Sequence, residues 1–133
     1  MNKDPLDKFI IDEAETLDKE LLANLMDSSF KLTKGGEFVF YKQFYKKPGW
    51  EKILRFLVGR KIILTKKLKK DFKEEIKPKE ISETLGIPKK TVTKFLSNEL
   101  KGLTKSEKGA HKIPNYNLHK CEEILKKNVK ANS

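Results

Sequence analysis

The sequence predicts a mainly helical α+β protein that carries two short β-hairpins. Apolar residues recur at three- and four-residue steps in four separate stretches, which is the period of an amphipathic helix. Glycine-containing turns at 33–36 and 106–110 are each flanked by short β-prone runs, a pattern typical of hairpins. A chain of 133 residues can bury one real core, so we expect one domain with extensions.

The N-terminal part combines a helix with the first hairpin. We expect a helix over 12–28, acidic at its start where acids suit the helix dipole, and packed on the body rather than on a second copy. The hairpin over 30–41 follows. Its second strand is apolar on both faces, with Phe38 on one and Val39 on the other, so it is either covered or open to a partner chain.

A longer helix is expected over 48–68, with apolar residues wide enough to touch two surfaces. Gly59 within it costs about 1 kcal/mol relative to alanine, and a close helix crossing would explain it. The polar stretch 69–77 then reads as a linker that ends at Pro78.

Residues 78–100 predict two short helices joined by a tight turn. Gly86 suits a turn that needs positive φ, and Pro88 suits the first position of the second helix because it lacks an N–H group. The apolar stripe of the second helix and its opposite, cationic face are distinct. The stripe holds Val92, Phe95, Leu96 and Leu100, and the opposite face holds Lys89, Lys90, Thr93, Lys94 and Ser97.

The segments 81–87 and 91–96 together resemble the helix-turn-helix of winged-helix DNA-binding proteins. The match is good at the apolar positions and at Gly86, and it departs at Ser82, where such motifs usually carry alanine. The resemblance implies that helix 88–101 enters the DNA major groove. Two amphipathic helices in an ordinary helical bundle remain the alternative.

The resemblance also implies a domain division. It gives an N-terminal helix and hairpin at 1–47, a winged helix-turn-helix at 48–116 with 103–114 as its wing, and a C-terminal helix and tail at 117–133. A wing of this kind lies along the phosphate backbone or in the minor groove. The implied DNA-binding residues are Lys79, Lys89, Lys90, Thr91, Thr93, Lys94, Ser97, Lys105, Lys108, His111 and Lys112.

The charge balance points to a polyanionic partner. The formal net charge is +11, from 30 basic and 19 acidic residues, yet residues 1–30 hold three lysines against eight acids. The remainder is therefore strongly basic, as in proteins that bind nucleic acid, although many lysines simply keep helix surfaces solvated. The only arginines, Arg55 and Arg60, lie outside the second helix, so bidentate recognition of guanine is scarce.

We expect neither an enzyme nor a cofactor or metal site. Cys121 lies on an apolar stripe, and His119 two residues away faces another side of the same helix, so they do not form a catalytic pair. A phosphate-binding glycine loop is missing, as is tetrahedral zinc spacing. One cysteine rules out an internal disulfide, and the sequence shows neither a signal peptide nor an apolar run that could span a membrane.

We therefore expect a cytoplasmic, nucleoid-associated protein that binds double-stranded DNA, most plainly as a transcriptional regulator. A homodimer is expected because one recognition helix reads too few base pairs, whereas no small-molecule ligand is evident. Plasmid maintenance and chromatin organisation use the same module. An RNA-binding or ribosome-associated protein, suggested by the aromatic and basic residues at 38–47, and a protein-interaction module remain alternatives.

Overall fold

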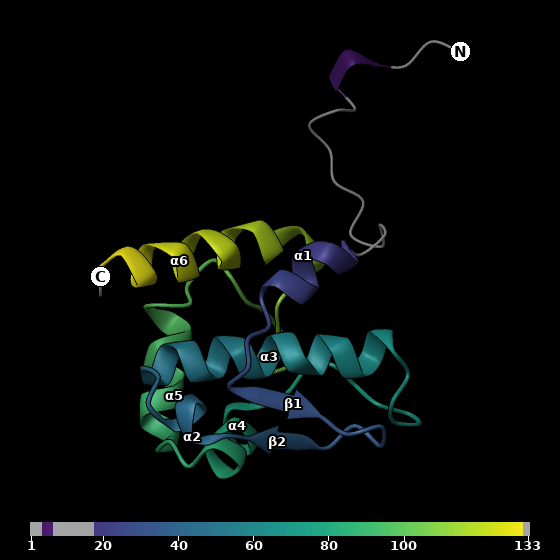
Figure 1. Cartoon of the computed structure of the whole chain (residues 1–133). Helices are drawn as coiled ribbons and strands as arrows, with labels where there is room; N and C mark the ends of the chain where they lie inside the picture. Colours follow the sequence, from purple (N-terminus) through teal and green to yellow (C-terminus); the bar gives the residue numbers. More distant parts are fainter. Residues whose placement is uncertain (1–3, 7–17, 132–133) are drawn as a thin grey trace.

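The computed structural model describes residues 4–6 and 18–131, with side chains up to residue 127. Helix α3 runs through the middle, with the β1–β2 hairpin and α4 on one side and α1 and α6 on the other (Figure 1). The elements are α1 (Lys19–Asn24), β1 (Phe30–Leu32), β2 (Phe38–Phe40), α2 (Lys42–Tyr45), α3 (Gly49–Thr65), α4 (Pro78–Leu85), α5 (Lys89–Ser97), β3 (Lys105–Glu107), β4 (Ala110–Lys112), the 3₁₀ turn η2 (Asn115–Asn117) and α6 (Leu118–Ala131). The expected α+β class is thus confirmed.

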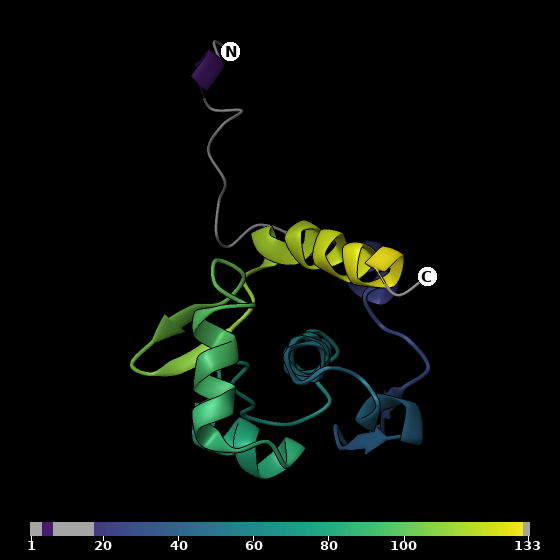
Figure 2. The same ribbon diagram turned by 90° about the vertical axis from the view of Figure 1, so that its left-hand side faces the viewer.

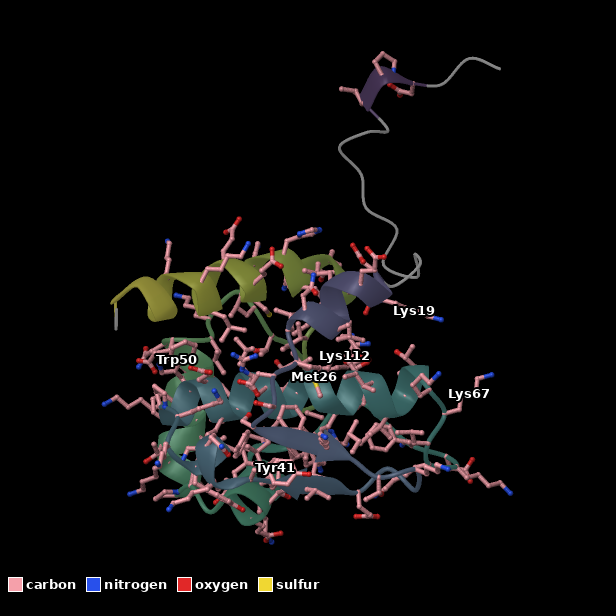
Figure 3. The ribbon with its side chains drawn as sticks, viewed as in Figure 1. Lys19, Met26, Tyr41, Trp50, Lys67 and Lys112 are labelled. Carbon is pink, nitrogen blue, oxygen red and sulfur yellow. The ribbon has the colours of Figure 1, made fainter. Side chains whose placement is uncertain are left out.

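One hydrophobic cluster joins the described elements. It extends from Leu21 in α1 to Leu125 in α6, and most of α3 is buried within it. The helix that we predicted over 48–68 is confirmed in its position, but it ends earlier, at Thr65. Lys67 takes φ 53°, and the N–H of Leu68 donates to the carbonyl of Ile63, which is the Schellman ending that terminates a helix. Lys67 extends from the loop that follows (Figure 3).

Gly59 is explained by the first hairpin and not by the helix crossing that we expected. A methyl group at Gly59 would lie 2.5 Å from Cε1 of Phe38 and 3.0 Å from Cε2 of Phe30. Those rings belong to β2 and β1, so the absence of a side chain at Gly59 lets the aromatic hairpin lie directly on α3.

Substituting Gly59 by alanine should therefore destabilise the fold. Overpacking costs about 1–3 kcal/mol, and the better helix propensity of alanine returns about 1 kcal/mol, so a net loss of up to about 2 kcal/mol is expected in urea unfolding. Gly35→Ala is the matched control, because its added methyl group would meet nothing closer than 3.9 Å. Equal stabilities for the two variants would contradict this account of Gly59.

The hairpin confirms the alternation expected for its second strand. Phe38 and Phe40 pack against the core, whereas Val39 is 39% exposed. β1 and β2 pair antiparallel with Phe30 opposite Phe40, and both rings contact Phe44 of α2. Most aromatic side chains of this region are therefore used in packing.

Only part of the first predicted helix lies in the described residues. Leu21, Leu22 and Leu25 are buried against the body, as expected, and α1 contacts α6. The helix begins after Asp18, whose carboxylate accepts a hydrogen bond of 3.0 Å from the N–H of Leu21. The expected start of the helix, at 12–17, lies outside the described residues.

A partly buried ionic cluster fixes the chain between α1 and β1 to the start of α3. Lys47 Nζ lies 2.9 Å from Asp27 and 3.2 Å from Glu51, and Arg55 Nη2 lies 3.2 Å from Glu51. Burial opposes ionisation of Asp27, but hydrogen bonds from Ser29 and Lys47 outweigh it and lower its pKa to about 2. Arg55 is thus committed to the fold and is withheld from any partner.

The stretch 69–77 is not the linker that we expected. Arg60 donates to the carbonyls of Glu74 (2.9 Å) and Lys73 (2.7 Å), and its guanidinium lies 4.6 Å from the ring centre of Phe72. Ile76 is 3% exposed and pairs with His111 in an antiparallel bridge. The sequence did not indicate this, because seven lysines and acids around two apolar residues are typical of a solvated segment, whereas tertiary contacts hold the segment against the body.

Candidate nucleic-acid interface

Helices α4 and α5 are the two short helices, joined by a tight turn, that the sequence predicted. Gly86 has φ 69°, and its N–H donates to the carbonyl of Ser82 at 2.9 Å, which ends α4 in a left-handed cap. Ile87 fills the corner and is 7% exposed. The apolar faces of both helices meet in the core, as the spacing predicted, through Ile81, Leu85, Val92 and Leu96.

The second helix is shorter than the expected 88–101. Pro88 is the N-cap residue and not the first helical residue, and the helix spans Lys89–Ser97. The chain leaves helical geometry at Asn98, yet Leu100 remains buried because the following turn brings it back to the core, where its N–H donates to Phe95 at 2.9 Å. Gly102, with φ 82°, belongs to that turn and does not end the helix.

The outer face of α5 is cationic and open. Lys89, Lys90, Thr93 and Lys94 are exposed, and Thr91 is half-buried. Among the described residues, the three ammonium groups contact no hydrogen-bond acceptor and no carboxylate. Ser97 is also exposed, although its hydroxyl donates to the carbonyl of Thr93 at 2.9 Å.

The lysines on this face of α5 destabilise the protein when no partner is bound. Lys90 and Lys94 stand four residues apart on one helix, where like charges are destabilising by about 0.2–0.5 kcal/mol. Acids that could compensate them do not occur between Pro88 and Asn98. An external polyanion would remove that repulsion, which makes α5 the strongest candidate for a binding surface.

The second predicted hairpin lies beside α5 and projects from the body (Figure 2). Its strands pair in the register Lys105↔Lys112, Ser106↔His111 and Glu107↔Ala110. The tip is the two-residue turn Lys108–Gly109, narrower than the expected 106–110, and both residues have positive φ as a type I′ turn requires. Lys108 is exposed at that tip, and Lys79 is exposed on α4.

The remaining hairpin residues do not share the surface of α5. Lys105 and Lys112 stand opposite each other and line a cavity between the hairpin and α3. His111 lies on the other face of the hairpin, half-buried, with Nδ1 buried and without a hydrogen-bond partner among the described residues. Burial lowers the pKa of His111, so its ring is neutral at pH 7 and brings no positive charge.

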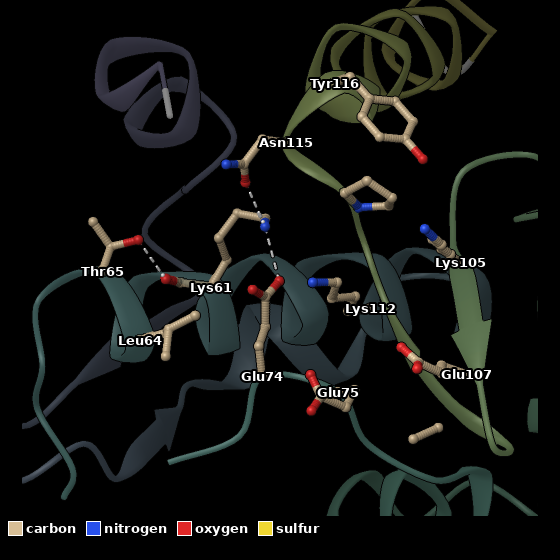
Figure 4. Close-up of a pocket in the computed structure, with 12 residues that line it drawn as sticks. Lys61, Leu64, Thr65, Glu74, Glu75, Lys105, Glu107, Lys112, Asn115 and Tyr116 are labelled. Carbon is tan, nitrogen blue, oxygen red and sulfur yellow. Dashed lines mark hydrogen bonds and ion pairs between the residues drawn. The ribbon is translucent and has the colours of Figure 1, made fainter. Parts of the chain in front are cut away.

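That cavity has a volume of about 490 Å³ and contains a buried ion pair that we did not foresee. Lys61 is 3% exposed, and its ammonium lies 2.8 Å from Glu74 Oε2 and 2.7 Å from Asn115 Oδ1 (Figure 4). In the sequence, Lys61 lies at helical spacing from Leu54 and Leu57, on the apolar face of α3. The only sequence feature that could have indicated the ion pair was therefore a lysine inside an apolar stripe, because a buried lysine is almost always paired with an opposite charge.

Cys121 has the structural role that the sequence predicted. It is fully buried, and burial raises the pKa of its thiol to about 12, although the charge of Lys61 opposes the shift. The thiol is therefore not ionised at neutral pH, and an un-ionised thiol is a poor nucleophile.

Comparisons with models of protein families, with curated proteins and with solved structures give no match to this chain. In the described part of the chain, every helix is too short or too polar to cross a membrane. The same residues contain no group of histidine, cysteine, aspartate and glutamate side chains arranged to hold a metal ion. Function must therefore be argued from the surface of α5 and its neighbours.

Proposed function

We propose that the protein binds double-stranded DNA as a transcriptional regulator and inserts α5 into the major groove. The observation that carries the proposal is the exposed face of α5, whose three lysines lack partners among the described residues. A helix in the major groove can place its N-terminal half against base edges, where threonine and lysine donate hydrogen bonds. The proposed role is binding, without catalysis.

The surroundings of α5 support a winged-helix arrangement. The order of elements is α3, α4, α5 and then the β3–β4 hairpin, which is the order that the resemblance implies, and Ile76 pairs with His111 of that hairpin. Lys108 at the hairpin tip and Lys79 on α4 would neutralise phosphates on either side of the groove. Both arginines are engaged inside the fold, so we propose lysine, hydroxyl groups and DNA shape as the means of discrimination.

We also propose that a homodimer binds two half-sites. A single recognition helix of nine residues touches few base pairs, and symmetric proteins gain selectivity by reading half-sites about 34 Å apart. Selection of bound sequences from a random duplex pool would reveal both a preferred sequence and the spacing of its repeats.

The salt dependence of duplex binding tests the electrostatic part of the proposal. If about six phosphates are engaged, the logarithm of affinity should fall with the logarithm of salt concentration with a slope near −5. Fluorescence anisotropy of a labelled duplex at several salt concentrations gives that slope. A nearly flat dependence would contradict binding through the lysines of α5.

An RNA partner is the second candidate, and one observation favours it. Tyr41 and Tyr45 are 40% and 56% exposed, next to exposed Lys42 and Lys46, and exposed rings can stack on single-stranded bases. Competition between duplex DNA and single-stranded RNA of equal length separates the candidates. Preference for duplex supports α5 as the interface, and preference for RNA supports the surface around α2 (Lys42–Tyr45).

A further inference from the structure

The cavity between α3 and the β3–β4 hairpin has the size and composition of a small-molecule site. Its volume of about 490 Å³ falls within the range of about 300–1,000 Å³ that is common for ligand pockets. Its walls come from α3, from the segment before α4, from the hairpin and from η2. They include three basic and three acidic side chains, Lys61, Lys105, Lys112, Glu74, Glu75 and Glu107.

One ammonium group in this cavity makes no ion pair with the described residues. Lys112 is half-buried, and its ammonium has neither a hydrogen bond nor an ion pair with any described residue. It stands directly across the hairpin from Lys105. An anionic group bound near Lys112 would give its ammonium the partner that it lacks among the described residues.

The buried ammonium of Lys61 offers a further donor. It carries three N–H groups, and its contacts with described residues are those to Glu74 and Asn115. One N–H of a lysine that is 3% exposed is thus left without an acceptor from the described protein. Because unsatisfied buried donors cost free energy, an acceptor oxygen on a ligand would be stabilised there.

The acidic residues of the cavity disfavour a ligand that carries only negative charge. Glu75 and Glu107 line the same space, and neither has an ion pair with a described residue. A purely anionic ligand would be repelled by these carboxylates, whereas a molecule with a carboxylate and an ammonium group satisfies both signs. Leu64 and Tyr116 add apolar surface for a side chain.

We propose that this cavity binds a free amino acid. The carboxylate accepts hydrogen bonds from Lys112 and Lys61, and the α-ammonium lies against Glu75 and Glu107. This binding goes beyond the proposed function and does not depend on it.

Binding is tested without DNA, on the full chain, by calorimetric titration and by melting temperature with each common amino acid in turn. At least one is expected to bind and to raise the melting temperature. Lys112→Ala should weaken binding of that amino acid about tenfold or more, because a charge-assisted hydrogen bond is lost. Lys120→Ala, at an exposed position on α6, is the matched control and should bind like the wild type.

Three results would overturn this proposal: failure of every amino acid to bind, equal affinity in Lys112→Ala, or equal affinity for acetate, which lacks the ammonium group. If an amino acid binds but no duplex does, the proposed function fails and the cavity assignment stands.

Discussion

Replacing Lys89, Lys90 and Lys94 together by glutamate is expected to abolish duplex binding and to leave the fold intact. Each of these ammonium groups is exposed and without a partner among the described residues, so its replacement removes no internal contact. A hydrogen bond to a charged group contributes about 1.5–3 kcal/mol, so loss of three such contacts alone corresponds to at least about a thousandfold. Repulsion between the new carboxylates and phosphates adds to that loss.

The control must separate position from overall charge. Replacing Lys34, Lys120 and Lys127 by glutamate changes the net charge by the same amount at exposed positions away from α5. Anisotropy titrations at one salt concentration compare the two triple variants, and circular dichroism checks that both are folded. We expect a much smaller loss in the control, because exposed charges separated by more than about 10 Å are screened by salt. Equal losses would mean that basicity alone, and not α5, accounts for binding.

The two helices α4 and α5 and the turn between them could be predicted because their determinants are local. Gly86 marks the turn, and the apolar residues on either side recur within one or two helical turns of it. The end of α5 could not be predicted in the same way. Leu96 and Leu100 are four residues apart, which fits a continuous helix, yet the chain leaves the helix at Asn98 and buries Leu100 by a turn. Periodicity identifies a buried residue without showing how the backbone brings it there.

The contacts that position the candidate site are mostly non-local, and the sequence did not indicate them. Ile76 pairs with His111 across 35 residues of chain, and Lys61 meets Asn115 across 54. The register of the second hairpin likewise decides that Lys105 and Lys112 line a cavity rather than continue the surface of α5. A pattern of lysines and acids predicts solvation of each residue, and only the fold determines which of them share a face.

The second large prediction concerns the stability that the buried ion pair between Lys61 and Glu74 gives to the fold beside the β3–β4 hairpin. Glu74→Ala leaves the ammonium of Lys61 in a site 3% exposed without its carboxylate at 2.8 Å. Removing one partner of a buried ion pair costs about 3–5 kcal/mol, because the remaining charge is neither hydrated nor compensated. Urea unfolding should show that loss. Glu75→Ala is the neighbouring control, and its exposed position predicts a change within about 0.5 kcal/mol.

Replacing both partners by apolar residues shows whether the ion pair stabilises the fold more than apolar packing would. Lys61→Met combined with Glu74→Leu should recover much of the stability lost in Glu74→Ala, because a buried ion pair and a well-packed apolar pair are often of similar stability. The same double variant removes the contact at 2.7 Å between Lys61 and Asn115, which joins α3 to η2 beside the cavity. If Glu74→Ala were no less stable than Glu75→Ala, the ammonium of Lys61 would have to reach water, and the cavity would lack the buried charge on which its proposed ligand depends.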